Sequence, residues 1–221
     1  MAIFQRNLTS LLLEKALRDY LLLHKTSKHV LEVGCGDGNI TRSVAADFRH
    51  NKYFASDISR EAIEEANKLR PDDLKEIIEF KTSEGFQHWD NSEFDIILCD
   101  ISAINQKIAA ISDWYVGIQH ETGDDGLKSI RPIIENAIRY LTPDGIFILP
   151  LISLSNTSKL LDLLSQNFKS VTLVESKDWP VPKELSQKII ELKIPNKGVD
   201  WSTKNKFGIE IANTGVLLCE I

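Results

Sequence analysis

Apolar and polar positions along the chain follow two periodicities. Residues 8–21 place leucines and other apolar side chains at helical spacing with charged residues between them, a pattern that predicts an amphipathic helix. Six later segments are short apolar runs, "HVLEVG", "KYFASD", "IIEFKTS", "FDIILCD", "GIFILPL" and "SVTLVES". Because they are apolar on both faces, these runs are typical of strands buried in a parallel sheet.

Helical patterns alternate with these strands, at residues 39–48, 59–69, 127–141 and 156–168. This alternation predicts a doubly wound, Rossmann-like α/β fold, with helices on both faces of a mostly parallel, seven-stranded sheet. The C-terminal stretch "FGIEIANTGVLLCEI" predicts two strands joined through Asn213, Thr214 and Gly215, as an antiparallel hairpin at the sheet edge.

No repeat or interdomain linker interrupts these patterns. We therefore expect one domain over residues 1–221, made of an N-terminal helix in 1–28, a central core in 29–151 and a C-terminal half in 152–221. No apolar stretch approaches the roughly 18 residues that a membrane-spanning helix needs, so no membrane association is expected. The first helix and the C-terminal hairpin are candidates for an interface in a homo-oligomer.

Composition narrows the class of protein. Hydrophobic residues at 43% and charged residues at 26% are typical of a globular protein. A net charge of -6 gives no general attraction to nucleic acid or anionic membranes. Three cysteines without a CxxC pair favour a reduced, cytoplasmic setting. The five histidines have no metal-ligand spacing, so no metal is expected.

Glycines occupy every second position directly after the first predicted strand: Gly34, Gly36 and Gly38. Ligands of open α/β sheets bind outside the carboxyl ends of the strands, and a missing Cβ lets a ligand approach the backbone. Asp57 ends the second strand about 20 residues on, where a carboxylate binds ribose hydroxyls. The G-x-G-x-G spacing departs from the G-x-G-x-x-G of dinucleotide sites. Glu32 suits a cationic amine better than a pyrophosphate.

At these motifs the sequence resembles the class I S-adenosylmethionine-dependent methyltransferases. "LEVGCGDG", "FASDIS", "SEGF", "FDIILCD" and "YLTPDGIFIL" are similar to successive motifs of that class and cover residues 30 to 150. The resemblance implies S-adenosylmethionine as cofactor. The cofactor-binding residues that it implies are Glu32, Gly34, Cys35, Gly36, Gly38, Asp57, Ile58, Ser83, Glu84 and Asp100.

Their roles follow from the same resemblance. Glu32 and the backbone of the glycine loop hold the methionine end of the cofactor. Asp57 binds the ribose hydroxyls, Ile58 flanks adenine, and Glu84 or Ser83 reaches the adenine amino group.

Within the class, "RNLTSLLLEKAL" and "GDDGLKSIRPIIENAIRYLTPDG" resemble the release-factor glutamine methyltransferase branch. That branch carries N-P-P-Y at the end of the fourth strand, where this chain has Asp100, Ile101, Ser102 and Ala103. Methylation of a glutamine amide or an adenine amino group is therefore disfavoured. Asp100 is a candidate catalytic residue that accepts a proton from a hydroxyl or amine, or else a helix cap or a contact to the cofactor amine.

The segment after the fourth strand carries further candidates. Ser102, Trp114 and Tyr115 are predicted to bind substrate, since binding residues often lie on loops above a rigid sheet. Packing of the loop onto the sheet explains Trp114 and Tyr115 equally well. His120 is a second candidate base, because histidine titrates near neutral pH, although it also fits an ordinary surface position.

These features together predict methyl transfer to an O or N nucleophile by in-line displacement. The acceptor is expected to be a small molecule or a protein side chain. Two alternatives stay open at this point: an RNA or DNA base methyltransferase, which the acidic charge disfavours, and a cofactor-binding protein without catalysis. An NAD-dependent oxidoreductase is disfavoured by the glycine spacing.

Overall fold

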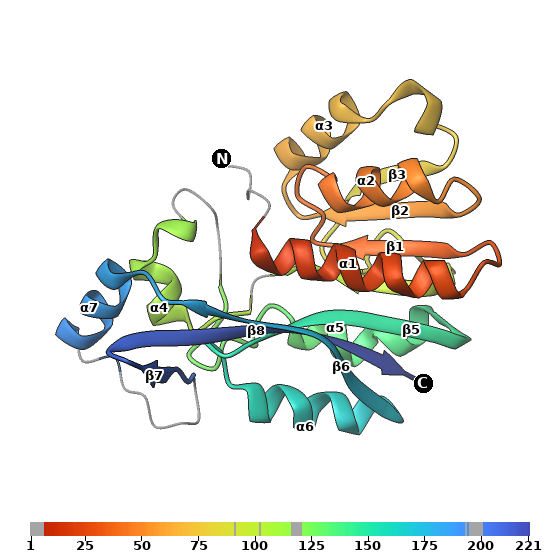
Figure 1. The fold of residues 1–221 in the computed structure, drawn as a ribbon. Coiled ribbons are helices and arrows are strands. Elements are labelled where there is room, and N and C mark those ends of the chain that lie inside the picture. The colour runs from red at the N-terminus through yellow and green to blue at the C-terminus, as the bar shows by residue number, and fades with distance from the viewer. Residues whose placement is uncertain (1–6, 91, 102, 116–120, 193, 195–200) are drawn as a thin grey trace.

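One sheet of eight strands organises the protein (Figure 1). The computed structural model describes residues 7–90, 92–101, 103–115, 121–192, 194 and 201–221. The strand order is β3-β2-β1-β4-β5-β8-β6, with β7 also paired to β8. The strands are β1 His29–Val33, β2 Lys52–Asp57, β3 Ile78–Thr82, β4 Phe94–Cys99, β5 Leu141–Ile152, β6 Ser170–Pro180, β7 Lys204–Lys206 and β8 Ile209–Glu220.

Strands β1 to β5 pair in parallel, whereas β8 runs antiparallel to β5, β6 and β7. This confirms the predicted Rossmann-like, mostly parallel fold. Strands β1 to β6 overlap the six apolar runs of the sequence. The expectation of a buried parallel strand is wrong for the last run, because β6 lies at the end of the sheet, is mostly exposed and pairs antiparallel with β8.

Helices lie on both faces of this sheet. They are α1 Leu8–Leu23, α2 Asn39–Asp47, α3 Arg60–Leu69, α4 Gln106–Ile111, α5 Arg131–Ala137, α6 Thr157–Asn167 and α7 Lys183–Glu191, with short 3-10 helices η1 Asp72–Leu74, η2 Asp113–Tyr115 and η3 Ile138–Tyr140. Helix α5 begins later than its apolar pattern because Pro132 lies in its first turn, where the missing N–H of proline is tolerated. No helix among the described residues is long and apolar enough to cross a membrane.

Alternate residues of the central strands face opposite helical layers. Val30, Ile96 and Ile148 belong to one buried cluster with α1, α2 and α3, whereas their neighbours Leu31 and Ile97 pack with α5 and α6. Figure 1 shows α1 and α2 on one side of the sheet and α5 and α6 on the other. Side chains alternate between the faces of a strand, so strands covered on both sides need apolar residues at every position.

The predicted C-terminal hairpin is wrong in its position. Strand β8 runs without a turn through Asn213–Gly215, and it lies between β5 and β6 rather than at the edge. Thr214 pairs with β5 on one side and with β6 on the other. The hairpin turn is at Phe207 and Gly208, both with left-handed φ values, +55° and +80°. It joins β8 to β7, an exposed three-residue strand that makes the sheet eight-stranded instead of seven-stranded.

Candidate active site

The loop from β1 to α2 turns through three left-handed glycines. Gly34, Gly36 and Gly38 have φ values of +81°, +53° and +74°, a region that side chains with a Cβ rarely adopt. Two of them also lie against the protein itself. A Cβ on Gly34 would approach Ile101 Cγ1 to 2.8 Å, and a Cβ on Gly38 would approach the Phe80 ring to 2.5 Å. At these two positions the space freed by glycine is therefore filled by the chain's own side chains, which corrects the expectation that it serves a ligand.

The amide groups at the start of this loop are bonded within the protein. The N–H groups of Gly34 and Cys35 donate to the carbonyl of Ser56, at 2.8 and 3.0 Å, and the N–H of Gly36 donates to Asp57 Oδ2 at 2.9 Å. Among the described residues, the Gly34 carbonyl accepts no hydrogen bond. The start of the loop thus offers a ligand the Gly34 carbonyl as an acceptor, which suits an ammonium group.

Asp57 is held at the end of β2 by two backbone donors. Besides the Gly36 amide, the N–H of Ser59 donates to Asp57 Oδ1 at 2.9 Å. The next residue, Ile58, is 70% exposed, which is unusual for a large aliphatic side chain. The end of β2 thus presents a fixed carboxylate beside an open apolar surface, the two features that the ribose and the base of a nucleoside need.

Glu32 lies at the base of the same end of the sheet and is 2% exposed. Thr41 donates to its Oε2 from both the backbone N–H, at 3.1 Å, and the side-chain hydroxyl. Burial nevertheless raises the pKa of Glu32 to about 8, and the nearby charge of Asp100 adds to the shift. No lysine or arginine among the described residues forms an ion pair with it. A cationic ligand would supply the missing positive charge.

Asp100 follows β4, beside the glycine loop. Its N–H donates to the Val33 carbonyl at 3.0 Å, and its Oδ2 accepts a hydrogen bond from the hydroxyl of Ser10 at 2.6 Å. Burial raises the pKa of Asp100 to about 6, although the Ser10 hydrogen bond acts in the opposite direction. The carboxyl group therefore titrates close to neutrality, where a proton acceptor is useful.

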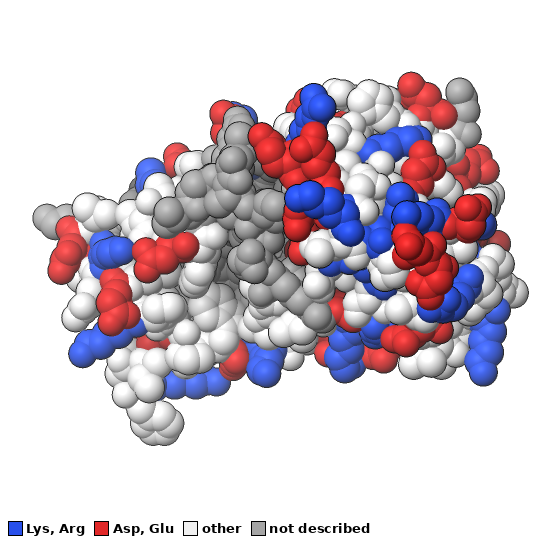
Figure 2. Space-filling model, turned by 90° about the horizontal axis from the view of Figure 1, so that it is seen from above, with Lys and Arg blue, Asp and Glu red and all other residues white. Residues whose placement is uncertain are grey.

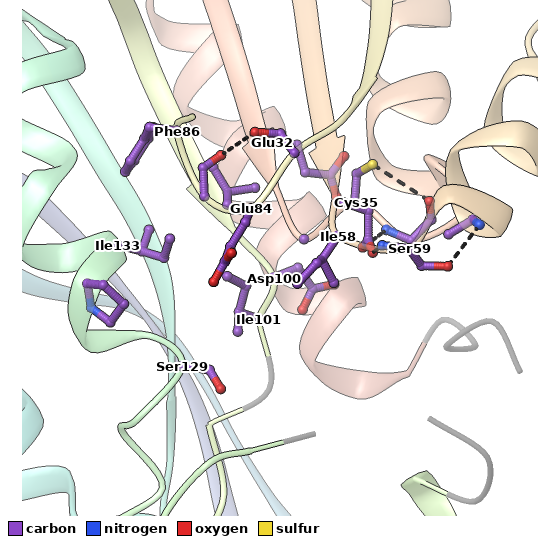
Figure 3. Close-up of a pocket in the computed structure, with 18 of the residues that line it drawn as sticks. Glu32, Cys35, Ile58, Ser59, Glu84, Phe86, Asp100, Ile101, Ser129 and Ile133 are labelled. Atoms are coloured by element: carbon purple, nitrogen blue, oxygen red, sulfur yellow. Dashed lines mark hydrogen bonds between the residues drawn. The ribbon is translucent and has the colours of Figure 1, made fainter. Parts of the chain in front are cut away.

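These groups surround a cavity of about 1200 Å³. Ligand pockets usually have volumes of about 300–1,000 Å³, so this cavity is large enough for a cofactor that contains a nucleoside. In Figure 3, Ile58 and Ser59 lie on one side of the cavity and Ser129 and Ile133 on the other, with Asp100 between them. The sequence-predicted residues that line the cavity are Glu32, Gly34, Cys35, Gly36, Asp57, Ile58, Ser83, Glu84 and Asp100.

Several sequence-predicted residues are not brought to this cavity. Gly38 is the N-cap of α2 and packs on Phe80. Trp114 stands edge-on to Trp179, with ring centroids 5.7 Å apart, and is not part of the cavity wall. Ser102 and His120 lie outside the described residues, as does the side chain of Tyr115.

Two of the lining residues, Cys35 and Ser83, have side chains that are not free to react with or bind a ligand. Burial raises the pKa of the Cys35 thiol well above its usual value, so the thiol stays protonated and is no nucleophile. The Ser83 hydroxyl accepts from the N–H of His88 and donates to the Gly85 carbonyl, both at 3.3 Å. Glu84, by contrast, is exposed at the cavity.

Sequence reasoning missed the contributions of two helices. The start of α1, with its N-cap, and α5, with the residues on either side of it, supply further lining residues: Asn7, Thr9, Ser10, Lys128, Ser129, Pro132, Ile133, Asn136 and Tyr140. The pattern of residues 8–21 predicts helix α1 but carries no signal of which strand end it meets. Only packing onto the sheet brings Ser10 to Asp100.

The comparisons with known proteins identify the family. A methyltransferase domain family model matches residues 24–207. The chain belongs to the methyltransferase domain family. This methyltransferase is 30% identical over 128 residues to a bifunctional methyltransferase of Rickettsia felis, an alignment that covers 54% of the chain and 24% of the relative. The chain spans about a quarter of the length of the curated relatives it matches.

Solved structures share its fold. The Thermus thermophilus 16S rRNA N2 G1207 methyltransferase, solved with AdoMet and guanosine, superposes with a TM-score of 0.62 at 19% identity, over 98% of this chain and 43% of that one. The N-methyltransferase NodS from Bradyrhizobium japonicum, solved with S-adenosyl-L-homocysteine, gives 0.51 at 14% identity, over 94% and 87%. The methyltransferase class predicted from the sequence is confirmed. The narrower glutamine methyltransferase branch stays a prediction.

Proposed function

We propose that this methyltransferase uses S-adenosylmethionine and transfers the methyl group to an O or N nucleophile of a small molecule or a protein side chain. One observation carries the cofactor assignment. Three left-handed glycines hold the Gly36 amide on Asp57, while the buried carboxylate of Glu32 lies two residues before Gly34 without a cationic partner among the described residues. This combination fits a ligand that carries both ribose hydroxyls and an ammonium group.

Each part of the cofactor has a matching group. Glu32 pairs with the ammonium group, which also donates to the Gly34 carbonyl, an oxygen without a donor among the residues that the structure describes. The remaining lone pairs of the Asp57 carboxylate accept from the ribose hydroxyls. The exposed face of Ile58 packs on adenine, and Glu84 accepts from the adenine amino group, since the Ser83 hydroxyl is engaged within its own loop.

Asp100 is the proposed proton acceptor at the other end of the cavity. The bound cofactor supplies a methyl group activated by a positively charged sulfur. Asp100 takes the proton that the acceptor loses, and its pKa near 6 leaves it mostly ionised at neutral pH. Ser102, Tyr115 and His120 keep their predicted roles as hypotheses, outside what the structure describes.

The charge of the cavity supports an acceptor that is not a polyanion. Among the described lining residues, two are basic, Arg60 and Lys128, and eight are acidic: Glu32, Asp37, Asp57, Glu61, Glu84, Asp90, Asp100 and Glu121. On the face shown in Figure 2, acidic and basic side chains are interspersed rather than gathered into a basic patch. Binding of nucleic acid depends on neutralising phosphates with Lys and Arg, so a small molecule or a protein side chain fits better.

Calorimetric titration with S-adenosylhomocysteine, with NAD in a parallel experiment, tests the cofactor assignment. We expect micromolar binding of the first ligand and none of the second. Absence of S-adenosylhomocysteine binding would overturn the proposal. Labelled S-adenosylmethionine, incubated with extract fractions before and after protease or nuclease treatment, then identifies the class of acceptor.

The role of Asp100 is tested by replacement. Asp100→Asn keeps the shape of the side chain but removes the proton acceptor. We expect turnover of the identified acceptor to fall about 100-fold, with S-adenosylhomocysteine affinity within a few-fold of wild type. Unchanged turnover would leave the cofactor assignment intact and remove Asp100 from the mechanism.

A further inference from the structure

A hydrogen bond joins helix α1 to the proposed proton acceptor. The Ser10 hydroxyl donates to Asp100 Oδ2 at 2.6 Å, across 90 positions of sequence. A separation of about 2.5–2.7 Å is typical of a hydroxyl that donates to an ionised carboxylate, one of the stronger hydrogen bonds in proteins. Ser10 is only 4% exposed, so water competes little for this bond.

Both partners are held in place independently. Asn7 caps α1 by accepting from the N–H of Ser10 at 3.1 Å, and Leu13 and Leu17 fix the helix in the buried cluster on the sheet. Asp100 is anchored by its own N–H on Val33. Its carbonyl also lies so near Gly34 that a Cβ there would be 3.2 Å away. The hydroxyl and the carboxylate therefore meet through rigid elements on both sides.

The second carboxylate oxygen has no hydrogen-bond donor in the described part of the chain. Among the described residues, Oδ1 of Asp100 accepts no hydrogen bond, and Asp100 lines the cavity. The Ser10 hydroxyl is thus the one donor to this carboxylate in the described part of the chain.

The charged groups near this carboxylate do not replace that donor. Glu32 on β1 and Asp57 on β2 are acidic, and the charge of Asp57 raises the pKa of Asp100 further. The two basic residues of the cavity wall are engaged elsewhere, since Arg60 pairs with Glu64 and Lys128 with Glu121.

We propose that Ser10 is a positioning residue, which holds one oxygen of Asp100 so that the other, Oδ1, faces the methyl acceptor and takes its proton. This inference rests on the proposed function. In the reaction, the lone pair of the acceptor's O or N forms the bond to the methyl carbon, the carbon–sulfur bond breaks with its electrons going to sulfur, and the proton passes to Asp100 Oδ1. Ser10 keeps its own proton throughout.

Carboxyl-carbon NMR on the protein labelled at aspartate tests the contact without any substrate. The Asp100 signal is assigned by its loss in Asp100→Asn. Because the hydroxyl stabilises the ionised form, Ser10→Ala is expected to move the titration midpoint of Asp100 upward by about one pH unit. Ser10→Thr, which retains the hydroxyl, is expected to restore it.

Kinetics test the consequence for catalysis. With the acceptor identified by labelling, Ser10→Ala is expected to lower kcat about tenfold and to move the acidic limb of the kcat/KM profile to higher pH. Affinity for S-adenosylhomocysteine should stay within twofold. Ser165→Ala is the matched control, since it removes an exposed hydroxyl of helix α6 whose hydrogen bond is to its own turn. It should change neither quantity.

The outcomes separate the two proposals. If wild-type protein fails to bind S-adenosylhomocysteine, the proposed function fails, while the NMR titration still reports on the Ser10–Asp100 pair. If the cofactor binds but the midpoint and kcat of Ser10→Ala match wild type, the positioning role is wrong. Should Ser10→Ala melt too low for study, Ser10→Cys keeps the side-chain volume with a weak donor and must show the same upward shift.

Discussion

The two ends of the cavity are built in different ways. At the proposed cofactor end, backbone amides after β1 donate to groups at the end of the neighbouring strand β2, as in the bonds from Gly34 to Ser56 and from Gly36 to Asp57. At the proposed acceptor end, Ser10 of α1 meets Asp100 after β4, and Ser129, just before α5, and Ile133 of α5 lie on the opposite wall (Figure 3). The geometry of the cofactor end is set by backbone conformation at the strand ends. The geometry of the acceptor end depends on how helices distant in sequence pack onto the sheet.

This difference predicts different responses to substitution. A change in the glycine loop alters backbone angles that the fold itself uses, so stability and cofactor binding should fall together. A change at the acceptor end removes a side-chain contact and leaves the backbone unchanged, so turnover should fall with stability largely retained. The predictions below test this contrast.

Gly38→Ala should have the largest effect. The new Cβ requires a left-handed φ of +74° and meets the Phe80 ring at 2.5 Å. Backbone strain of about 1–2 kcal/mol and overpacking of about 1–3 kcal/mol together lower the free energy of unfolding by about 3 kcal/mol. Urea denaturation measures the loss, and calorimetry should show S-adenosylhomocysteine binding lost or strongly weakened.

Gly208→Ala is the matched control. Its φ is +80°, but nothing lies within 4 Å of the new Cβ, so only the backbone cost of about 1 kcal/mol applies. If the two variants lose equal stability, the contact with Phe80 does not contribute to the loss, and only the left-handed φ constrains position 38.

Asp57→Asn should cost about 100-fold in S-adenosylhomocysteine affinity. In the asparagine side chain, an NH2 group replaces one of the two oxygens that accept from the N–H groups of Gly36 and Ser59, and this group cannot accept a hydrogen bond. Each hydrogen bond to a charged group contributes about 1.5–3 kcal/mol. Calorimetry measures this directly. Asp90→Asn, an exposed acid on the same cavity wall, should bind within a few-fold of wild type; equal losses in both variants would indicate a general effect of charge.

Most residues predicted to bind the cofactor line the cavity, whereas Trp114, predicted at the acceptor, does not, and this difference has a physical reason. Left-handed glycines and a strand-end aspartate can be recognised from a short stretch of sequence, because the backbone conformation requires those residue types at fixed spacing. Helix α1 was predicted as a helix, but its docking depends on contacts with β5 and β8 more than 100 residues away, and no local pattern specifies these. The error in the predicted hairpin has a related cause. The residue types of Asn213–Gly215 favour a turn, but pairing with β5 and β6 on the two sides keeps this segment extended within strand β8.

The buried Glu32 makes stability depend on pH. Its pKa is raised to about 8 in the folded state, so between pH 4.5 and 8 the folded protein holds a proton that the unfolded chain has lost. Stability therefore falls as pH rises through this window. Asp100 contributes in the same direction up to about pH 6.

Glu32→Gln removes the larger contribution. Denaturation at pH 5 and pH 8 should show wild type losing about 3 kcal/mol more than the variant. Saturating S-adenosylhomocysteine should flatten the wild-type dependence, since its ammonium group stabilises the ionised carboxylate. An identical pH dependence of wild type and Glu32→Gln would show that the carboxyl group is ionised without a ligand.

Trp114→Ala should have the smallest effect on the site. The sequence leaves Trp114 open between a substrate contact and a packing residue. In the structure its ring stands edge-on to Trp179, away from the cavity wall, and is 37% exposed. Such an aromatic pair contributes about 0.5–1.5 kcal/mol, so thermal unfolding should shift modestly while kcat and cofactor affinity stay within twofold of wild type. Trp179→Ala should destabilise more, because the Trp179 indole also donates to the Thr214 hydroxyl at 2.9 Å. A tenfold loss of kcat in Trp114→Ala at unchanged stability would instead extend the acceptor end as far as helix η2, and the cavity described here would then be only part of the substrate site.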